Sequence, residues 1–445
     1  MIVAKFGGSI LDGADGLQRL RREVEMIDAP LLVVVSAFAK TTQRLERAAR
    51  MAVDDLDGAV WSLAEIWGEH DVIARALFGE QSYDAWSSEM EPQRARLTDI
   101  LEGLSIVGEL SPRTLDLVEH FGERLSSSLV ARALGAAHLP ATDLIVTDDA
   151  HRFARVIDEP TKERVERLAA PLLASAPRAV VVTEGYIARG SHGEITTMGR
   201  ESSDYSAAIL GAALGAREVR IYTGVPGIMT ADPALVPSAA TIPAMSYEMA
   251  RTVGVLGAKV IHPRTIRPLE ITGIPLILTD LDGHSTIIGD APSAQRIREG
   301  RTFALTHLVG IRYIRCRLAR TDTPVDRIVE AAEEFGPVIH VERSGRTLSM
   351  LLSAKGEGIV EGLRRASDAV VDLEATRAGL ISFVVEGAMS THDIVDFLRG
   401  LGDLAPRNLW ANTQNESHVA AISALVIEEI DAPLLERVHT ACRRT

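Results

Sequence analysis

The segment Ile2-Val3-Ala4-Lys5-Phe6-Gly7-Gly8 opens the chain with an apolar run that stops at two glycines. Asp15–Ile27 then has helical periodicity, and Leu31-Leu32-Val33-Val34-Val35 is almost purely aliphatic. A strand without alternating polar residues is typical of a parallel sheet that helices cover on both faces. This order of strand, helix and strand therefore predicts an α/β fold with a mostly parallel sheet sandwiched by helices.

The same alternation continues along the first two thirds of the chain. Residues 41–135 are rich in Ala, Leu, Arg and Glu with few β-branched runs, so we expect several helices packed beside the sheet. Asp204–Leu214 is predicted as a helix capped by the preceding serines. Further strands are predicted at Asp143–Val146, Ala179–Thr183, Val219–Thr223 and Pro275–Leu278.

The pattern changes near residue 300, after turn residues that cluster around Asp282-Gly283 and Asp290-Ala291-Pro292. Beyond this point the order strand, helix, strand, strand, helix occurs twice, at a period of roughly 65 to 75 residues. Such a repeat predicts a tandem of ferredoxin-like βαββαβ modules. We therefore expect three domains, at residues 1–295, 303–370 and 373–445.

Composition excludes several functional classes. Hydrophobic residues make up 46% of the 445 residues, and the formal net charge of -14 disfavours a nucleic-acid partner. Cys316 and Cys442 are the only cysteines, so the sequence offers no disulfide framework and no zinc site. The longest apolar stretch, around Leu31 to Ala39, is shorter than the ~20 residues that span a bilayer. We expect a cytoplasmic protein that binds neither nucleic acid nor a membrane.

Lys5-Phe6-Gly7-Gly8-Ser9 lies at the end of the first predicted strand. Glycines there let backbone N–H groups approach phosphate oxygens, and a lysine adds a positive charge. The alternative is a plain turn. Neither a Walker A loop nor G-x-G-x-x-G occurs at a strand end, so the segment is not a P-loop or a Rossmann fingerprint.

The segment Thr196–Tyr205 places Arg200 just before a predicted helix N-terminus, beside Ser202, Ser203 and Asp204. Helix capping explains Ser203 or Asp204. It does not explain Arg200, because a cation is disfavoured at a helix N-terminus unless an anion accompanies it. The segment therefore favours an anion site, with a simple helix cap as the alternative.

Other segments could carry chemistry or serve as ordinary connections. Gly257-Ala258-Lys259-Val260 places a second lysine near a strand, whereas His262 precedes a proline and is better explained as structural. Glu123 lies near a helix start, where an acid ordinarily complements the helix dipole. Two turns follow a predicted strand, at Thr223–Gly227 and Thr230–Pro233.

In order and spacing, these segments resemble the motifs of aspartate kinases, which belong to the amino acid kinase superfamily. The resemblance covers about residues 1 to 285, and the repeat that follows is similar to the paired ACT regulatory modules of the same family. The matching segments are Lys5–Gly8, Val33–Ala37 with Thr41-Thr42, Gly122–Ser126, Thr196–Ala207, Ala231–Pro233 and Gly257–Pro263.

The resemblance implies phosphorylation of the side-chain carboxylate of L-aspartate by ATP with Mg²⁺. Lys5 and Lys259 would hold the transferring phosphate and Asp204 would orient the lysines. For the substrate, Arg200 would bind the α-carboxylate, Glu123 the α-ammonium, and Thr42 and Ser203 would donate hydrogen bonds. Nucleotide contacts would come from Lys5, Gly7, Gly8, Ser9, Thr223, Asp232 and Lys259. No protein ligand of the metal is implied.

Three positions depart from the family pattern. Glu201-Ser202 stands where Gly-Gly is usual, which places a carboxylate beside the anion site. Gly224 stands where the family commonly has an aspartate, and Ser9 replaces Thr-Ser. These departures motivate one alternative, an amino-acid sensor with a catalytically weak kinase domain. A kinase for another acidic amino acid is the second alternative.

The resemblance also implies regulation and assembly. Lysine or threonine would be the effector, bound by the ACT modules as an end product of the pathway. The sheet edges of these modules could pair with those of a second chain, which implies a homodimer or a higher homo-oligomer.

Overall fold

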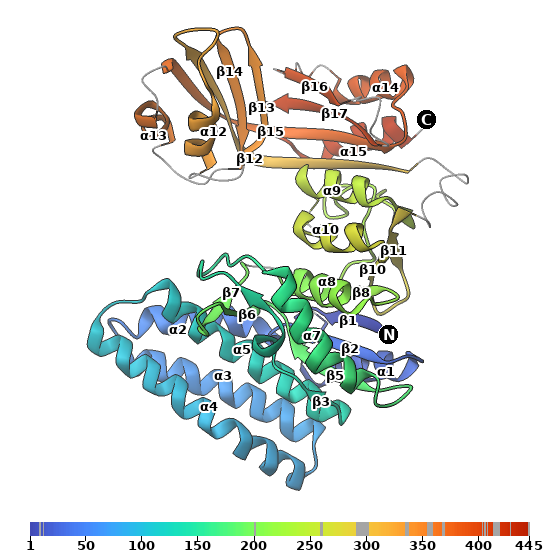
Figure 1. Ribbon diagram of the computed structural model, residues 1–445. Coiled ribbons are helices and arrows are strands. Elements are labelled where there is room, and N and C mark those ends of the chain that lie inside the picture. The colour runs from blue at the N-terminus through green and yellow to red at the C-terminus, as the bar shows by residue number, and fades with distance from the viewer. Residues whose placement is uncertain are drawn as a thin grey trace. The chain divides into compact units, whose positions relative to one another are not determined.

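A computed structural model describes the chain except for residues 9, 12, 200, 201, 259, 260, 291–301, 334–337, 354–358, 367–369, 403, 405, 407, 413–418, 428, 444 and 445 (Figure 1). The chain divides into two compact units. The first consists of Met1–Gly227 and His262–Ser293, and the second of Ile228–Ile261 and Ala294–Thr445. Among the described residues, no helix combines the length and the apolar composition needed to cross a membrane.

A mostly parallel sheet forms the centre of the first unit, in the order β3-β5-β2-β1-β8-β10-β11. Neighbouring strands are parallel except β10 and β11, which are antiparallel. Every residue of β2 is buried, as expected for a central strand that is covered on both faces. The strands are β1 (Ile2–Phe6), β2 (Leu31–Val35), β3 (Ala137–His138), β5 (Val180–Glu184), β8 (Val219–Tyr222), β10 (Leu276–Thr279) and β11 (Ser285–Ile288).

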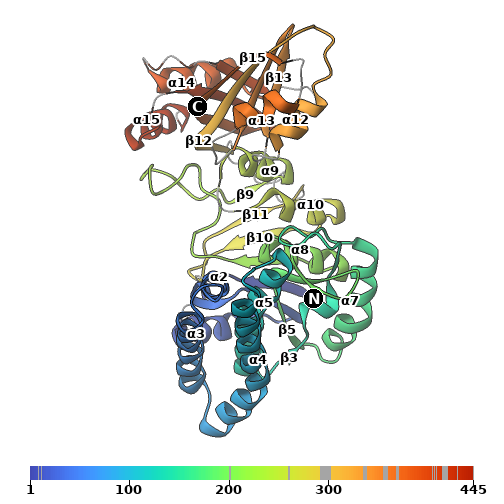
Figure 2. The same cartoon turned by 90° about the vertical axis from the view of Figure 1, so that its left-hand side faces the viewer.

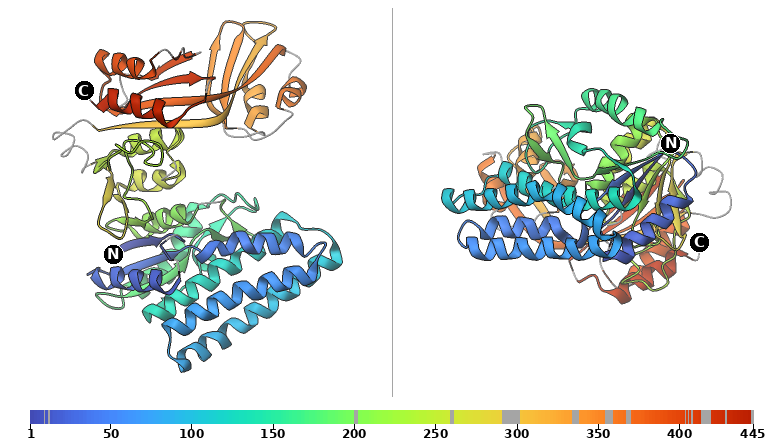
Figure 3. Two further views of the ribbon diagram at one scale, coloured as in Figure 1. Left: turned by 180° about the vertical axis from the view of Figure 1, so that it is seen from behind. Right: turned by 90° about the horizontal axis from the view of Figure 1, so that it is seen from below.

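Helices cover both faces of this sheet, which confirms the predicted α/β class. Figure 2 shows α7 and α8 on one side of the sheet, and α3 and α4 on the other. Figure 3 shows α3 and α4 running side by side. The helices are α1 (Gly13–Met26), α2 (Thr41–Met51), α3 (Leu56–Leu77), α4 (Glu80–Val107), α5 (Pro112–Leu134), α7 (Asp158–Leu173), α8 (Ser203–Leu214) and α10 (Pro263–Thr272), with a short 3-10 turn at Phe38–Lys40.

Helix α5 has clear start and stop signals. The Ser111 hydroxyl accepts a hydrogen bond from the N–H of Thr114, and Pro112 occupies the first helical position. The helix ends at Gly135, whose φ of 60° is in the left-handed region. This helix carries most of the buried polar groups discussed below.

The predicted strand at Asp143–Val146 is wrong. Ala141–Leu144 forms the short helix α6, and only Val146–Thr147 is extended, as β4. The reason is a tertiary contact, because the buried Glu184 carboxylate accepts the N–H of Ala141 at 2.6 Å and so caps the helical turn. A second, three-stranded sheet joins β4 to β6 (Ile187–Gly190) and β7 (Ile195–Thr197).

The second unit contains a six-stranded antiparallel sheet in the order β13-β14-β12-β15-β17-β16. Its strands are β12 (Phe303–Leu318), β13 (Val338–Ser344), β14 (Thr347–Leu352), β15 (Val370–Glu386), β16 (Asn408–Asn412) and β17 (Val419–Val426). Its other elements are β9 (Ala244–Met245), α9 (Tyr247–Val255), α12 (Asp326–Glu333), α13 (Ile359–Ala366), α14 (Thr391–Leu401) and α15 (Ala432–Arg443).

Two hydrophobic cores confirm the predicted pair of ferredoxin-like modules. One contains Ile314 and Leu348 with α12 and α13, and the other contains Leu305 and Phe383 with α14 and α15. The long strands β12 and β15 run through both modules. The first half of β12 pairs with the second half of β15, so the second module takes a strand from a segment that precedes the first module. The division at residues 303–370 and 373–445 stays a prediction.

Candidate active site

Lys5 lies in the central strand β1 and faces helix α8. Ala4 and Phe6 pack in the core on the other face of the sheet, so the alternation of side chains turns Lys5 toward α8. Its Nζ lies 2.6 Å from Oδ1 of Asp204, in the first turn of α8. The two side chains are only 12% and 16% exposed, so the positive charge is held in place near the end of the strand.

A second polar pair joins α2 to α5. Thr42 Oγ1 donates a hydrogen bond to Glu123 Oε1 at 2.9 Å. The two helices approach closely at Gly122, where a Cβ atom would lie 3.2 Å from Thr41 Cγ2 and 3.4 Å from the backbone N of Thr42. Glycine at this position therefore allows the threonine to reach the carboxylate.

The carboxyl group of Glu123 is only half satisfied. The side chain is buried, and Oε2 has no hydrogen-bond partner among the described residues. Burial raises the pKa of Glu123 to about 8, although the hydrogen bond from Thr42, the nearby N–H of Ala37 and the charge of Lys5 favour the ionised form. A cation placed against Oε2 would stabilise the carboxylate and return its pKa toward the usual range.

The glycine turn after β1 lies against the loop after β2. A Cβ at Gly8 would be 2.7 Å from the carbonyl oxygen of Ala37, so only glycine fits there without a shift of the backbone. The N–H of Gly7 donates to the carbonyl of Tyr222 at 3.2 Å. The predicted phosphate contact of the Gly7 N–H would require the loss of this hydrogen bond, which leaves Gly8 as the freer donor of the pair.

Ser203, the first residue of α8, is buried against Gly185 at the end of β5. A Cβ at Gly185 would lie 2.6 Å from the Cβ of Ser203 and 2.8 Å from its Cα. Ser202 occupies the N-cap position of α8, but its side chain makes no capping hydrogen bond. The helix therefore starts where predicted, and the predicted side-chain cap from Ser202 is wrong.

We expect Gly185→Ala to displace the start of α8, because the added methyl group meets backbone and cannot be accommodated by a side-chain rotation. The variant should lose about 1 to 3 kcal/mol of unfolding free energy in urea denaturation. Gly68→Ala is the matched control, since a Cβ at this exposed position in α3 meets no atom within 4 Å. That control should be neutral or slightly stabilising, and equal losses in both variants would contradict the close approach.

The structure gives less information about the other predicted site residues. Thr223 follows β8, and its N–H donates to the carbonyl of Thr279 at 2.9 Å. Asp232 belongs to the second unit, where Oδ1 accepts the N–H of Ala234 at 3.0 Å. Ser9, Arg200 and Lys259, and also Glu201, lie outside the described residues.

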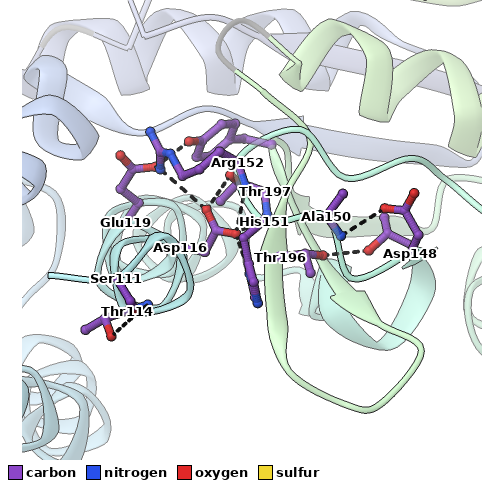
Figure 4. Close-up of polar contacts among 12 residues, drawn as sticks. Ser111, Thr114, Asp116, Glu119, Asp148, Ala150, His151, Arg152, Thr196 and Thr197 are labelled. Carbon is purple, nitrogen blue, oxygen red and sulfur yellow. Dashed lines mark hydrogen bonds and ion pairs between the residues drawn. The ribbon is translucent and has the colours of Figure 1, made fainter.

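A buried ionic network beside this site was not predicted. Asp116 and Glu119 lie on the same face of α5 as Glu123, at helical spacing. Arg152 pairs with both, with a guanidinium nitrogen 3.4 Å from Asp116 Oδ1 and a closer contact to Glu119 Oε2 (Figure 4). The Tyr186 hydroxyl also donates to Glu119. The signal in the sequence was the spacing of Asp116, Glu119 and Glu123, which places three acids on one face of a helix.

The network fixes β7, the strand that leads toward residue 200. Thr197 donates from its hydroxyl to Asp116 Oδ1 at 2.7 Å, and His151 Nδ1 lies 2.9 Å from Asp116 Oδ2. Thr197 is therefore a structural residue. Arg152 and Tyr186 both have positive φ values, 75° and 71°, a conformation that non-glycine residues rarely adopt. Such backbone persists only where surrounding contacts hold it, as this network does.

Glu184, at the end of β5, is a further buried acid that the sequence analysis missed. Its Oε1 lies 3.0 Å from His138 Nε2 and 3.5 Å from an Arg124 guanidinium nitrogen. These partners outweigh its burial and lower the pKa of Glu184 to about 2. Because it is ionised and fully paired, Glu184 is a structural residue.

Comparison with known proteins identifies the family of the chain. The sequence model of the amino acid kinase family matches residues 1–280, more than half of the chain. The chain belongs to the amino acid kinase family. The matched region contains every candidate site residue placed above, whereas β11 and the β12 to α15 segment lie beyond it.

Similar curated proteins of this kinase family are aspartokinases. A chloroplastic bifunctional aspartokinase/homoserine dehydrogenase 2 of Arabidopsis thaliana is 31% identical over 302 residues, which cover 65% of this chain and 32% of that protein. The aspartokinase of Chlamydia pneumoniae is 31% identical over 283 residues, 62% of this chain and 60% of that protein. The chain thus spans less than two thirds of the length of these relatives.

Solved structures show the same fold over almost the whole chain. The structure of E. coli aspartokinase III in complex with aspartate and ADP has a TM-score of 0.81 at 22% identity and covers 99% of both chains. The same enzyme in complex with lysine and aspartate has a TM-score of 0.75 at 23% identity, again over 99% of both chains. The amino acid kinase domain and the tandem of small modules therefore occur together in a known architecture.

Proposed function

We propose that this amino acid kinase transfers the γ-phosphoryl group of ATP to the side-chain carboxylate of L-aspartate, giving 4-phospho-L-aspartate and ADP. The aspartokinase relatives support the substrate class. The observation that carries the proposal is the buried Glu123, because one of its carboxylate oxygens has no partner among the described residues and its pKa is raised to about 8. An ammonium group is the ligand that would satisfy this oxygen.

Glu123 would recognise the amino group of the substrate. The α-ammonium of aspartate would donate to Oε2 of Glu123, while Thr42 holds Oε1 and so fixes the plane of the carboxylate. A charge-assisted hydrogen bond in a buried site is stronger than a neutral one. Ser203, at the start of α8, would donate to the same substrate, and Arg200 would bind its α-carboxylate through two parallel hydrogen bonds.

The phosphoryl transfer itself needs charge neutralisation more than proton transfer. The attacking carboxylate has a reference pKa near ~3.9 and is ionised at neutral pH, so no general base is required. Lys5 would contact the oxygens of the transferring phosphoryl group, where negative charge accumulates. Asp204 holds the Lys5 ammonium in position, because its Oδ1 lies 2.6 Å from Nζ.

The nucleotide contacts complete the proposal. Gly8 would give a backbone N–H to the phosphates, and Ser9, Lys259, Thr223 and Asp232 would contribute further contacts. ATP would enter as its Mg²⁺ complex, in which the metal is held mainly by phosphate oxygens and water. Of the described carboxylates here, Asp204 is engaged by Lys5 and Glu123 is buried with a raised pKa, so we assign no protein ligand to the metal.

A panel of acceptors tests the proposed substrate. ADP release by the purified chain with MgATP should depend on L-aspartate. It should be at least about tenfold slower with L-glutamate, which adds a methylene. Succinate, which lacks the ammonium, should not support turnover. Turnover with succinate equal to that with aspartate would contradict a role for the ammonium, and preference for glutamate would assign a different acidic amino acid.

The pH dependence should report Glu123 directly. With a pKa of about 8 in the free enzyme, this acid is mostly protonated at pH 6 and must ionise to accept an ammonium. We therefore expect kcat/KM for aspartate to rise about 50-fold between pH 6 and pH 8. Thr42→Val should shift this rise in kcat/KM to higher pH, since the hydrogen bond that it removes stabilises the ionised form of Glu123. A level profile over this range would contradict the assignment.

We also propose how the protein is regulated, how it assembles and where it is located. The tandem of small modules would bind lysine or threonine and would pair with a second chain through its sheet edges to give a homodimer or a larger homo-oligomer. Cys316 and Cys442 are buried free thiols, which suits a reducing compartment such as the cytoplasm.

A further inference from the structure

A basic cavity lies in the first unit, on helix α5 and the β6–β7 hairpin. It has a volume of about 410 Å³ and is lined by groups from α4, α5 and the hairpin of β6 and β7. A smaller cavity of about 190 Å³ shares part of this lining and adds Arg124. The charged and titratable lining residues are Arg96, Arg113, His120, Arg189 and Glu194. None of them belongs to the candidate active site.

Helix α5 explains why this cavity is basic. Arg113, Leu117, His120 and Arg124 are spaced by four, three and four residues, so they form one stripe along the helix. The acids Asp116, Glu119 and Glu123 form another stripe of the same helix. One side of α5 therefore serves the candidate active site, while a different side lines the cavity.

Two arginines of the lining carry charge that the protein does not neutralise. Arg189 is paired with Asp143 at 3.3 Å, and Arg124 with Glu184 at 3.5 Å. Arg96 and Arg113, by contrast, form no ion pair or hydrogen bond within the described part of the chain.

The charged lining residues include one acid, Glu194. It lies beside Asp149, which pairs with His192 at 2.6 Å. His120 is partly buried, its Nδ1 bonds to the carbonyl of Leu117, and desolvation lowers its pKa to about 4, so it is neutral at pH 7. In a chain with a formal net charge of -14, this is a local excess of positive charge in a concave site.

We propose that this cavity binds a compact anion with at least two negatively charged oxygens, a phosphoryl group or a dicarboxylate, with Arg96 and Arg113 as its main ligands. The planar guanidinium group donates two parallel hydrogen bonds to such oxygens. A volume near 400 Å³ is in the range of small-molecule sites. The site goes beyond the proposed kinase activity and does not depend on it.

Calorimetric titration of the full chain with inorganic phosphate, and separately with succinate, tests this site without ATP or aspartate. We expect saturable binding of at least one of the two anions with Kd below about 1 mM. Arg96→Gln combined with Arg113→Gln should weaken that binding at least tenfold. The control, Arg19→Gln with Arg167→Gln, removes the same charge from exposed positions on α1 and α7 and should leave it unchanged.

The two anions separate the possible ligand classes, since tighter binding of phosphate indicates a phosphoryl group and tighter binding of succinate a dicarboxylate. Arg96→Lys with Arg113→Lys keeps the charge and should retain part of the affinity, which distinguishes lost ligation from lost folding. The proposal is overturned if wild type binds neither anion saturably, or if the glutamine variant binds both as tightly as wild type. A failure of the kinase assay would not affect either result.

Discussion

Lys5→Ala should lower kcat for phosphoryl transfer about 1,000-fold while KM for aspartate changes by less than about threefold. The ammonium of Lys5 places a positive charge near the carboxyl end of β1. This charge is needed most when negative charge develops on the phosphoryl oxygens. Asp204 holds it at 2.6 Å, so the geometry is present before the substrates bind. Initial rates of ADP release at varied aspartate and saturating MgATP measure both constants.

Two variants control this experiment. Lys162→Ala removes an exposed lysine from α7 and should leave kcat unchanged. Asp204→Asn keeps Lys5 but removes its partner, so its effect should be smaller than that of Lys5→Ala. If Lys5→Ala instead raised KM for aspartate and left kcat intact, Lys5 would be a substrate-binding residue and the proposed transfer geometry would be wrong.

Glu123→Gln should raise KM for aspartate at least ~100-fold, because the ammonium of the substrate would lose its buried ionic partner. Glutamine can still accept the hydrogen bond from Thr42, so the packing of α2 against α5 should persist. Glu166→Gln, at an exposed position on α7, is the matched control and should have no effect. An unchanged KM in Glu123→Gln would place the substrate ammonium elsewhere.

Without ligand, Glu123→Gln should also be more stable than wild type at alkaline pH. The pKa of Glu123 is raised in the folded state from 4.5 to about 8, so the folded protein binds more protons than the unfolded chain between these values. Wild-type stability therefore falls as pH rises through this window. Without ligand, Glu123→Gln should be more stable than wild type at pH 9 by about 2 to 4 kcal/mol and similar at pH 4. Urea denaturation at the two pH values measures the difference.

The parallel sheet was predictable because its strands are local and almost purely apolar. Ile2–Phe6 and Leu31–Val35 were predicted to the residue, and the segment 41–135 is helical as expected. The opposite orientations of Phe6 and Lys5 follow from the alternation of side chains alone. The chemistry at Lys5 and Glu123 was available only through the resemblance, since each residue alone also fits a plain turn or a helix dipole.

Features that depend on distant partners could not be predicted. The helix at Ala141–Leu144 needs the Glu184 carboxylate, which lies 43 residues away. The Arg152 network joins residues from α5, β7 and two separate loops that carry Arg152 and Tyr186, and no local pattern indicates either of these two residues.

The alternation of Ile314, Cys316 and Leu318 with Arg315 and Arg317 predicts a strand at these residues, but β12 begins earlier, at Phe303. Gly310 has a φ of 70°, and the register shifts between Leu308 and Ile311. Such a bulge reverses the alternation of side chains, so the pattern appears to begin only after it. The sequence predicts a strand at Leu380–Val385, whereas β15 begins at Val370. Most residues in the first half of β15 are not buried, so this half has no apolar face that a sequence pattern could indicate.

The identity of the product tests the proposed function most directly. The chain should be incubated with MgATP and L-aspartate and the product reduced with borohydride, which converts an acyl phosphate to an alcohol. We predict homoserine, the alcohol expected from phosphorylation of the side-chain carboxylate, in wild type and in Lys162→Ala, and its near absence in Lys5→Ala and Glu123→Gln. Absence of homoserine from folded wild-type protein, or reduction at the α-carboxylate instead, would contradict the proposed reaction.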